Sequence, residues 1–399
     1  MKLVDVNYVQ SENSPREWRI GGIRFGPLNL LVGSNASGKS RTLNIVNGLA
    51  KFLAGDSKVS IQSGDWNVTF DNEDKRLVYS LQVSDSKVTT EEFKVDDTVL
   101  LKRGAGGVGK IWAEKLQDFI DFQVPEDQLA AVARLDSIQH PFFEPLNTWG
   151  KSLYHYQFGT PLGKNTLGLI NPGTKAEVNP RDPDQVIGIF RKGEKEFGER
   201  FKESIKTDMA EIGYLIDEVG TAPPISIIVH GPQPFVALYV KESELGDVTD
   251  QGDMSQGMFR ALSIIIQLNY SNLSGKPSCI LIDDIGEGLD FERSCSLIKL
   301  LVGKAERSSV QLVMATNDRF VMNTVPLEAW TVLRRVGQKI KVYNHENSRK
   351  RFDEFKFTGM NNFDFFALNF LDDSDLPPFV TPGPTKLTPV RPGPCLDGV

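Results

Sequence analysis

One run of eight residues near the N-terminus constrains this sequence more than any other feature. The pattern G-x-x-x-x-G-K-S/T is matched in full by Gly33-Ser34-Asn35-Ala36-Ser37-Gly38-Lys39-Ser40. Glycines and small residues allow the chain to wrap around an anion with its backbone N–H groups pointing inward. The sequence therefore predicts a phosphate-binding loop, in which Lys39 reaches the β- and γ-phosphates of a nucleotide and Ser40 completes the shell of a magnesium ion.

The residues on either side of this loop supply the context that it needs. Leu28–Val32 is a continuous apolar run, typical of a buried strand. After the loop, residues 38–53 carry apolar side chains at helical spacing, at Leu43, Val46, Leu49 and Leu53. A buried strand that leads through the loop into an amphipathic helix is the arrangement of a P-loop, where the positive end of the helix dipole faces the anion.

A second apolar run, in the last third of the chain, ends in two acidic residues. Residues 279–282 have the pattern of a buried strand and are followed directly by Asp283 and Asp284. A P-loop requires an acidic partner at the end of a neighbouring strand to hold its magnesium ion. We expect Asp283 to orient the metal and Asp284 to act as general base or to position the attacking water. The alternative is that both carboxylates only cap the following turn.

Three stretches of the sequence resemble motifs of ABC-type ATPases. Residues 283–290, Asp-Asp-Ile-Gly-Glu-Gly-Leu-Asp, are similar to the Walker B motif and D-loop of that family. Residues 253–260 resemble a degenerate signature motif, with Ser255, Gly257 and the following helix as the matching parts. Residues 313–318 fall where the family has its switch strand and histidine. The resemblance covers the first 60 residues and roughly 225–345.

The resemblance implies that two copies of the chain close around ATP. In ABC-type proteins the signature serine and the helix that follows contact the γ-phosphate of the other subunit, so the nucleotide joins a homodimer. A helix N-cap at Ser255 is the alternative, and it uses the same N–H groups. The nucleotide-binding positions expected from the P-loop and the resemblance are Gly33, Ser34, Asn35, Ala36, Ser37, Gly38, Lys39, Ser40, Arg41, Ser255 and Gly257.

Three departures from the family pattern affect the expected chemistry. Asp284 stands where the family has its catalytic glutamate, Asn317 stands where it has the switch histidine, and the signature lacks its double glycine. An asparagine cannot take up a proton as histidine does. We expect Asp284, Lys39 and Asn317 to form a catalytic set with slow turnover. These departures resemble the AAA-like ATPases of bacterial operons, in the RecF-like and overcoming-lysogenisation-defect-like groups, including those of anti-phage defence.

The expected fold is an α/β P-loop head of the ABC type. We predict a mostly parallel sheet flanked by helices, because strands alternate with helices in the last third of the chain. Residues 66–70 and 77–83 read as hairpins of an N-terminal antiparallel part. The predicted division is a first core part at 1–110, a mainly helical insertion at 111–224 (with helices at 114–122 and 194–219), a second core part at 225–370 and a Pro-rich disordered tail at 371–399.

Composition limits the environment and partners of the chain. The 399 residues carry a net charge of −7, which argues against a protein that coats nucleic acid by bulk charge. Three cysteines without metal-ligand spacing favour a reduced, cytoplasmic location. The polar N-terminal residues do not form a signal peptide, and no apolar run approaches the roughly 20 residues that span a bilayer.

Several weaker signals leave alternatives open. Gln82 is a candidate for the Q-loop, and a solvent-exposed strand glutamine is the alternative. Trp18 precedes the P-loop as a base-stacking aromatic would, and packing in the core or on the surface is the alternative. The basic residues between 334 and 351 are solvated charge or a docking surface for nucleic acid or an acidic partner. The phenylalanine-rich stretch 352–370 is expected to pack on the core or on a partner.

Together these features favour an ATP-gated, magnesium-dependent switch that dimerises and controls a separate effector chain, such as a nuclease or toxin. Only about 50 residues follow the last core strand, too few for a further catalytic domain. The setting would be anti-phage defence or genome maintenance. One alternative is a nucleotide-sensing scaffold with little hydrolysis. Another is the ATPase subunit of a transporter, which the insertion and the degenerate signature disfavour.

Overall fold

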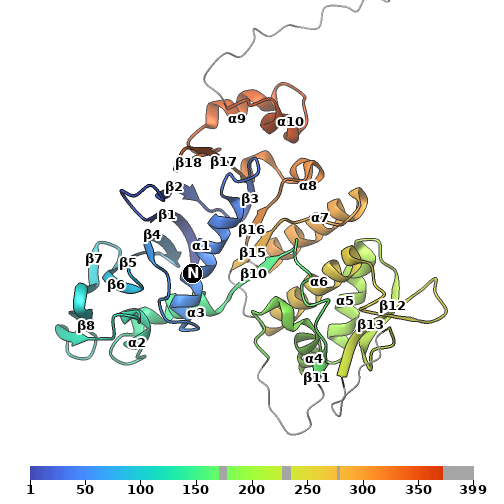
Figure 1. The fold of residues 1–399 in the computed structure, drawn as a ribbon, viewed down its shortest axis with the longest axis horizontal. Helices are drawn as coiled ribbons and strands as arrows, with labels where there is room; N and C mark the ends of the chain where they lie inside the picture. Colours follow the sequence, from blue (N-terminus) through green and yellow to red (C-terminus); the bar gives the residue numbers. More distant parts are fainter. Residues whose placement is uncertain (170–177, 227–234, 276–278, 309, 372–399) are drawn as a thin grey trace, which may run out of the picture.

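A large sheet runs through the whole molecule, with helices packed on both of its faces (Figure 1). The computed structural model describes residues 1–169, 178–226, 235–275, 279–308 and 310–371. Within these ranges the large sheet has 14 strands. They are β1 (Lys2–Gln10), β2 (Trp18–Arg24), β3 (Leu28–Val32), β4 (Ser63–Asn72), β5 (Lys75–Ser84), β6 (Lys87–Val95), β7 (Thr98–Arg103), β8 (Val108–Ala113), β9 (Asp118–Gln123), β10 (Leu153–Gln157), β15 (Cys279–Asp283), β16 (Gln311–Ala315), β17 (Trp330–Val336) and β18 (Lys339–Asn344).

The strands of this sheet divide into a parallel and an antiparallel region. Their order is β10-β15-β16-β3-β17-β18-β2-β1-β4-β5-β6-β7-β8-β9. The five strands from β10 to β17 pair in parallel, as do β18 and β2. The remaining neighbours pair antiparallel. The predicted α/β class is therefore correct, but the prediction of a mostly parallel sheet is wrong, because the N-terminal hairpins continue the same sheet.

Alternating side chains on the parallel strands separate two hydrophobic cores. On β3, Leu30 and Val32 enter one core and Leu31 enters the other. The same alternation places Ile282 of β15 in the first core and Leu281 in the second. A strand that is buried on both faces reads as a continuous apolar run, which is why β3 and β15 could be predicted from the sequence.

Helices cover the two faces unequally. On one face lie α1 (Lys39–Ala54), α2 (Ala130–Ala133) and α3 (Glu144–Lys151), with Leu43, Val46 and Trp149 in the second core. On the other lie α4 (Val186–Phe197), α5 (Glu199–Glu211), α6 (Gln256–Ser274) and α7 (Phe291–Ser308). Next to α4 and α5 is a smaller sheet of β11 (Gly168–Leu169), β12 (Ile216–Ala222), β13 (Phe235–Glu242) and β14 (Val248–Asp250) (Figure 1). The short helices are η1 (Ala105–Gly107), η2 (Pro141–Phe143), η3 (Pro183–Gln185) and η4 (Leu327–Ala329).

The structure corrects two of the predicted helices. Residues 114–122 form a turn and most of β9 rather than a helix, and 216–222 form β12 at the end of the predicted helix 194–219. In the first case the apolar spacing of Trp112, Leu116 and Phe119 mimics a helical face, but Leu116 is exposed at the hairpin turn. The predicted strand 225–229 lies partly outside the described residues, as does the predicted tail.

Apart from the exposed Phe357, the C-terminal phenylalanines pack on the core, which is one of the two predicted alternatives. After α8 (Arg319–Thr324), helices α9 (Arg349–Lys356) and α10 (Asn362–Ala367) fold against the upper end of the sheet in Figure 1. Phe352, Phe355, Phe365 and Phe370 are buried in the first core. None of the helices in the described residues is long and apolar enough to cross a membrane.

Candidate active site

The P-loop connects the end of β3 to the start of α1 in a conformation that small residues make possible. Gly38 has φ 105° and precedes the first residue of α1, and Ala36 has φ 62°. A side chain at position 33 would collide with the Ser37 hydroxyl and lie 2.6 Å from the carbonyl oxygen of Leu333 on β17. The first turn of α1 contains no acidic residue, so its N–H groups and dipole are available to an anion.

Lys39 is buried beneath this loop. Its Nζ donates hydrogen bonds to the carbonyl oxygens of Gly33 at 2.7 Å and Ser34 at 3.2 Å. Burial lowers the pKa of Lys39, and the carboxylates of Asp284 and Asp283 partly offset that shift. A lysine ammonium has three donors, so a phosphate oxygen could take the third without breaking the bonds that hold the side chain.

Asp283 ends β15 directly beside the P-loop serine. Its carboxylate is buried, is hydrogen-bonded to Ser40, and has an oxygen, Oδ1, that lacks a hydrogen-bond partner among the described residues. Burial raises the pKa of Asp283, and the Ser40 hydroxyl opposes the shift. A buried carboxylate oxygen without a partner, next to a hydroxyl, is a donor set that suits a hard cation such as magnesium. The residues present therefore fit the metal that the sequence implies.

Asp284 follows in a strained turn. Its φ of 51° lies in the left-handed region, which aspartate tolerates better than most residues. The turn is closed by a bond from the Glu287 N–H to the Asp284 carbonyl at 3.2 Å. Both carboxylates face Gly159, where an added Cβ would lie 2.6 Å from Glu287 Oε2 and 3.5 Å from Asp284 Oδ2. The end of β15 and the turn after it thus present the buried carboxylate of Asp283 and the more exposed carboxylates of Asp284 and Glu287.

Strand β16, which lies between β3 and β15, brings Asn317 next to the P-loop. Asn317 follows β16, and its Nδ2 donates to Oδ1 of Asn35 in the P-loop at 2.8 Å. The neighbouring Thr316 hydroxyl donates to the Ile285 carbonyl at 3.1 Å. The carboxyl ends of the parallel strands β3, β16 and β15 therefore gather Lys39, Ser40, Asp283, Asp284 and Asn317, which the sequence had placed almost 280 positions apart.

Within the described residues, the predicted signature residues Ser255 and Gly257 contact segments other than the P-loop. Ser255 is exposed, caps α6 by accepting from the Met258 N–H at 3.1 Å, and is hydrogen-bonded to Tyr214. Gly257 packs directly on Gly288 in the turn after Asp284. The N-cap reading of Ser255 is confirmed, and a contact between the signature and a phosphate stays a prediction.

Three residues near the site were missed as contributors by the sequence reasoning. Lys164 Nζ donates to the carbonyls of Gln251, Gly252 and Met254, at 3.0, 3.1 and 2.6 Å, and so fixes the loop that leads into Ser255. Arg260 on α6 donates to the Gly159 carbonyl at 2.8 Å, and Gly159 faces the carboxylates of Asp284 and Glu287. Arg260 belongs to the resembling stretch 253–260, but its partners are distant in sequence, and no local pattern predicts them.

The two weaker candidates have structural roles. Trp18 is 3% exposed, and the Arg41 guanidinium lies 4.2 Å over the centre of its ring. This confirms the packing alternative for Trp18. Gln82 is exposed on β5 and donates to Asp65 at 3.0 Å, which confirms the alternative of a surface strand glutamine.

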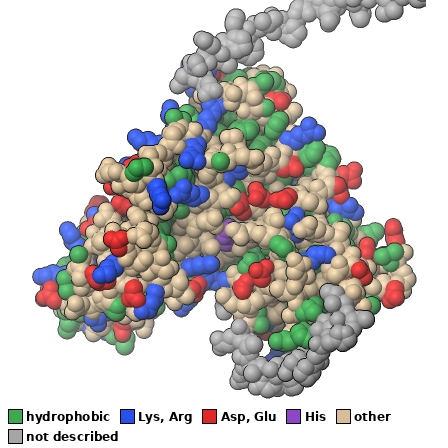
Figure 2. Space-filling view, in the orientation of Figure 1, with side chains coloured by type: hydrophobic (Ala, Val, Ile, Leu, Met, Phe, Trp, Pro, Cys, Tyr) green, Lys and Arg blue, Asp and Glu red, His purple; other side chains and the backbone are tan. Residues whose placement is uncertain are grey.

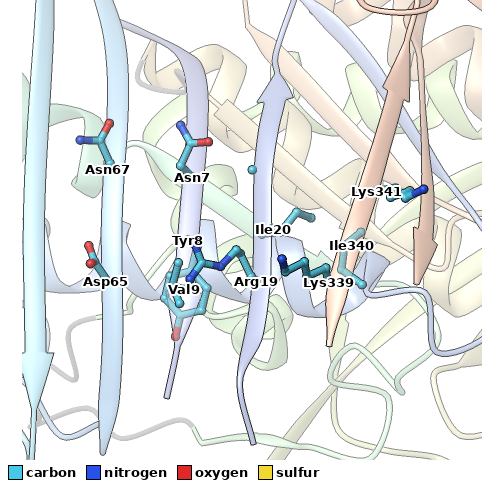
Figure 3. Close-up of a pocket in the computed structure, with 11 residues that line it drawn as sticks. Asn7, Tyr8, Val9, Arg19, Ile20, Asp65, Asn67, Lys339, Ile340 and Lys341 are labelled. Carbon is cyan, nitrogen blue, oxygen red and sulfur yellow. The ribbon is translucent and has the colours of Figure 1, made fainter. Parts of the chain in front are cut away.

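The hollow drawn in Figure 3 is separate from the candidate site. It measures about 480 Å³ and lies across β1, β2, β4 and β18. Lys339 and Lys341 line it together with Arg19 and Asp65, and Arg19 is paired with Glu12 and Glu17. This lining has mixed charge and includes no P-loop residue. On the face shown in Figure 2, acidic side chains gather near the centre beside α7, and basic ones lie towards β1 and β2.

Comparison with known proteins defines the class of fold. No protein-family model and no curated protein sequence matches this chain. Its structure is similar to that of an SMC head bound to the C-winged helix domain of ScpA, with 13% identity, a TM-score of 0.51 and coverage of 88% of this chain and 100% of that one. Two further SMC heads align less well. The Thermotoga maritima head has 12% identity, a TM-score of 0.43 and coverage of 86% and 99%. A head with an extended coiled coil, bound to the C-terminal domain of ScpA derived from Pyrococcus furiosus, has 11% identity, a TM-score of 0.46 and coverage of 89% and 100%.

The first of these alignments and the site geometry together place the chain in a class. It has the α/β fold of SMC heads, and a P-loop and an acidic strand end stand where its parallel strands end. The chain is therefore a P-loop protein with an SMC-head-like fold.

Proposed function

We propose that this chain binds ATP with magnesium, dimerises around it and hydrolyses it slowly, and that this cycle switches a separate effector chain. The observation that carries the proposal is the meeting of Lys39, Ser40 and Asp283 at the ends of β3 and β15. Lys39 is anchored by two loop carbonyls, and the Asp283 carboxylate lies beside Ser40 with a buried oxygen unpaired within the described residues. Phosphates and a hard cation are the ligands that suit these groups.

The chemistry of the proposed hydrolysis follows from the positions of the side chains. The P-loop N–H groups and Lys39 would hold the β- and γ-phosphates, and Ser40 and Asp283 would hold the magnesium ion. When bound, that ion neutralises charge on the phosphate oxygens. Asp284 would accept a proton from the attacking water or orient it. Asn317, which bonds to Asn35, would contact the same loop from the β16 side.

The position of the signature supports the dimer. Ser255 opens α6 with its first N–H groups at an exposed helix end, yet its contacts are with Met258 and Tyr214 rather than with the P-loop of the same chain. A helix N-terminus can bind a phosphate through its free N–H groups. In a dimer, the N-terminus of α6 would contact the phosphate that the P-loop of the second copy holds. The SMC head with a TM-score of 0.51 is bound to the C-winged helix domain of ScpA, and this neighbour supports the proposal that this chain also controls a partner.

The setting of the switch rests on the sequence resemblance alone. The ATPases of bacterial operons that it resembles include those of anti-phage defence, and genome maintenance is the related possibility. The effector would be a nuclease or toxin on another chain. Purification from the native host and mass spectrometry would identify it, and a homodimer recovered repeatedly without any partner would contradict this part of the proposal.

The central test is Asp284→Asn, which keeps the size of the side chain and removes its charge. We expect ATP binding to survive and phosphate release to fall on the order of 10²-fold, the scale of general-base loss. Trapped ATP should then shift the protein towards a dimer in light scattering. Glu287→Gln, in the same turn, is the matched control and should keep turnover. If Glu287→Gln loses turnover and Asp284→Asn does not, the base is Glu287.

A nucleotide-sensing scaffold is the second candidate, and one observation favours it. Asn317 is engaged with Asn35 and cannot relay a proton, so a site with this residue and the shorter Asp284 could hold ATP with little hydrolysis. Steady-state phosphate release separates the two functions. Turnover that Lys39→Ala abolishes favours the ATPase, and ATP-dependent dimers without phosphate release favour the scaffold.

A further inference from the structure

Arg260 is a buried cation on the second turn of α6. Its side chain donates hydrogen bonds to three backbone carbonyls from two distant segments. Nε reaches Thr160 at 3.0 Å, Nη2 reaches Gly159 at 2.8 Å, and Nη1 reaches Glu287 at 3.0 Å. The residue is 4% exposed. Burying a guanidinium against neutral carbonyls is costly compared with an apolar side chain of similar volume, so packing alone does not account for an arginine here.

Both segments that Arg260 holds adjoin the proposed catalytic carboxylate. Gly159 follows β10, which pairs in parallel with β15, and the preceding Phe158 N–H donates to the Asp283 carbonyl at 2.9 Å. Gly159 also faces the Asp284 and Glu287 carboxylates. On the other side, the Glu287 carbonyl that Arg260 holds belongs to the turn that Asp284 opens. The three hydrogen bonds therefore fix the backbone on two sides of Asp284.

The first turn of α6 packs on the same turn without space between them. An added Cβ at Gly257 would overlap the carbonyl oxygen of Gly288, and one at Gly288 would lie 2.8 Å from Arg260 Nη1. Because packed backbone of this kind cannot slide gradually, a shift of the α6 N-terminus must move residues 284–288 with it. The N-terminus of α6, which Ser255 caps, and the turn that begins at Asp284 are therefore expected to move together.

We propose that Arg260 is a positioning residue that couples the helix end at Ser255 to the catalytic carboxylate Asp284. When Ser255 contacts a phosphate held by a second copy, the position of Asp284 in the same chain would change. Nucleotide binding at one site of the dimer would therefore alter the hydrolysis rate at the other. This inference rests on the proposed function for its kinetic consequence. Its structural part, that Arg260 holds residues 158–160 and 284–288, does not.

The structural part is tested by hydrogen exchange without nucleotide. Arg260→Lys keeps the charge and stem but cannot reach three carbonyls, and Arg260→Gln removes the charge. In both variants we expect the amides of Phe158, Thr160, Glu287 and Leu289 to exchange at least about tenfold faster, since their local opening becomes easier. Gln267→Leu is the matched control, because Gln267 is buried on the same helix and bonds Pro183 instead. Unchanged exchange in both Arg260 variants would overturn the proposal.

The kinetic part uses the same variants. A misplaced base can cost on the order of 10²-fold, so Arg260→Lys and Arg260→Gln should lower kcat by between about tenfold and 10²-fold. Their ATP affinity should stay within about twofold of the parent, because the P-loop is untouched. In an Asp284→Asn background, Arg260→Gln should cause no further loss, since the residue acts through Asp284.

The outcomes separate this inference from the proposed function. Losses that add in the double variant, or a matching loss in Gln267→Leu, would show that Arg260 only stabilises the fold. If the parent protein neither binds nor hydrolyses ATP, the proposed function fails, and hydrogen exchange still decides whether Arg260 holds the two segments.

Discussion

The parallel and antiparallel halves of the large sheet bury charge in opposite ways. In the antiparallel half, Glu91 of β6 pairs with Arg103 at 3.2 Å and also accepts from Tyr79, Ala130 and Ala131 at 2.7–2.9 Å. In the parallel half, Asp283 is also buried, at 5% exposure against 0% for Glu91, but its Oδ1 has no partner within the described residues. Both oxygens of the Glu91 carboxylate have hydrogen-bond partners within the fold, and these bonds stabilise it. The Asp283 carboxylate keeps one oxygen that a ligand could contact.

The reason for this difference is topological. From β4 to β9, neighbouring antiparallel strands follow one another in the chain and are joined by short turns, such as the one with Asp85 at φ 53° and Ser86 at φ 60°, and those residues are needed to reverse the chain. Parallel strands need long crossovers, so all their carboxyl ends open at one edge of the sheet, where loops are free to carry chemistry. We therefore expect substitutions in the antiparallel half to change stability alone, and those at the strand ends to change nucleotide binding.

The largest expected effect belongs to the antiparallel half. Arg103→Met leaves Glu91 buried without its cation and removes the bonds to the carbonyls of Gln128 and Pro125. The free energy of unfolding should fall by about 3–5 kcal/mol in urea titrations, with ATP affinity unchanged by calorimetry. The double variant with Glu91→Leu should recover part of the loss. A large loss of ATP affinity in a folded Arg103→Met protein would break the comparison.

Acid should weaken the parallel half through His155 on β10. Burial lowers the pKa of His155 to about 4, whereas an unfolded chain keeps a value near 6.5. Between these values the unfolded state binds a proton that the folded state does not, so stability falls as the pH is lowered. From pH 7.5 to 4.5 this costs about 2–3 kcal/mol. His155→Leu should lose that much less over the same range in urea titrations, and an identical pH dependence would contradict the burial argument.

Lys39→Ala tests whether a substitution in the parallel half changes nucleotide binding more than stability. It removes a charge-assisted contact to phosphate, worth about 1.5–3 kcal/mol or more than tenfold in ATP affinity by calorimetry. The melting temperature should not fall greatly, because a buried ammonium is costly to keep. Lys51→Ala, at an exposed position on the same helix, is the matched control. Equal ATP affinity in Lys39→Ala and the parent would contradict the proposal that residues 33–40 bind the phosphates of ATP.

The smallest effect is expected at Asn317. Asn317→Ala removes one exposed hydrogen bond to Asn35 and should lower turnover by about two- to tenfold, equivalent to about 0.5–1.5 kcal/mol. Phosphate release and urea unfolding should be measured together. A fall in stability larger than the fall in turnover would show that the bond supports the fold rather than the site.

The features that the sequence predicted correctly are those written in contiguous residues. Gly33 to Ser40 define their loop locally, and Asp283 follows an apolar run that could only be a buried strand. Their meeting could be predicted as well, because carboxyl ends of parallel strands share an edge. The resemblance to ATPase motifs gave the order of these parts, and the fold agrees with it.

What could not be predicted depends on contacts between distant residues. The sheet is mostly antiparallel because β4 to β9 add to the edge begun by β1, and nothing in a hairpin sequence shows which sheet it joins. Residues 114–122 were misread because apolar spacing in a short run fits a helix and a hairpin alike. The partners of Arg260 are one hundred residues upstream and 27 downstream, so its role had no local signal.

The place of β3 in the sheet has a consequence for synthesis of the protein. Both strands that flank β3, namely β16 and β17, belong to residues 311–336, which are synthesised long after β3 itself. Until those residues are made, the N-terminal hairpins can assemble, but the strand that carries the phosphate loop has no hydrogen-bonded neighbour, since such long-range pairing comes late. A nascent chain would therefore acquire its binding site only after residues 311–336 have been made, and nucleotide capture would report that translation has passed β16 and β17.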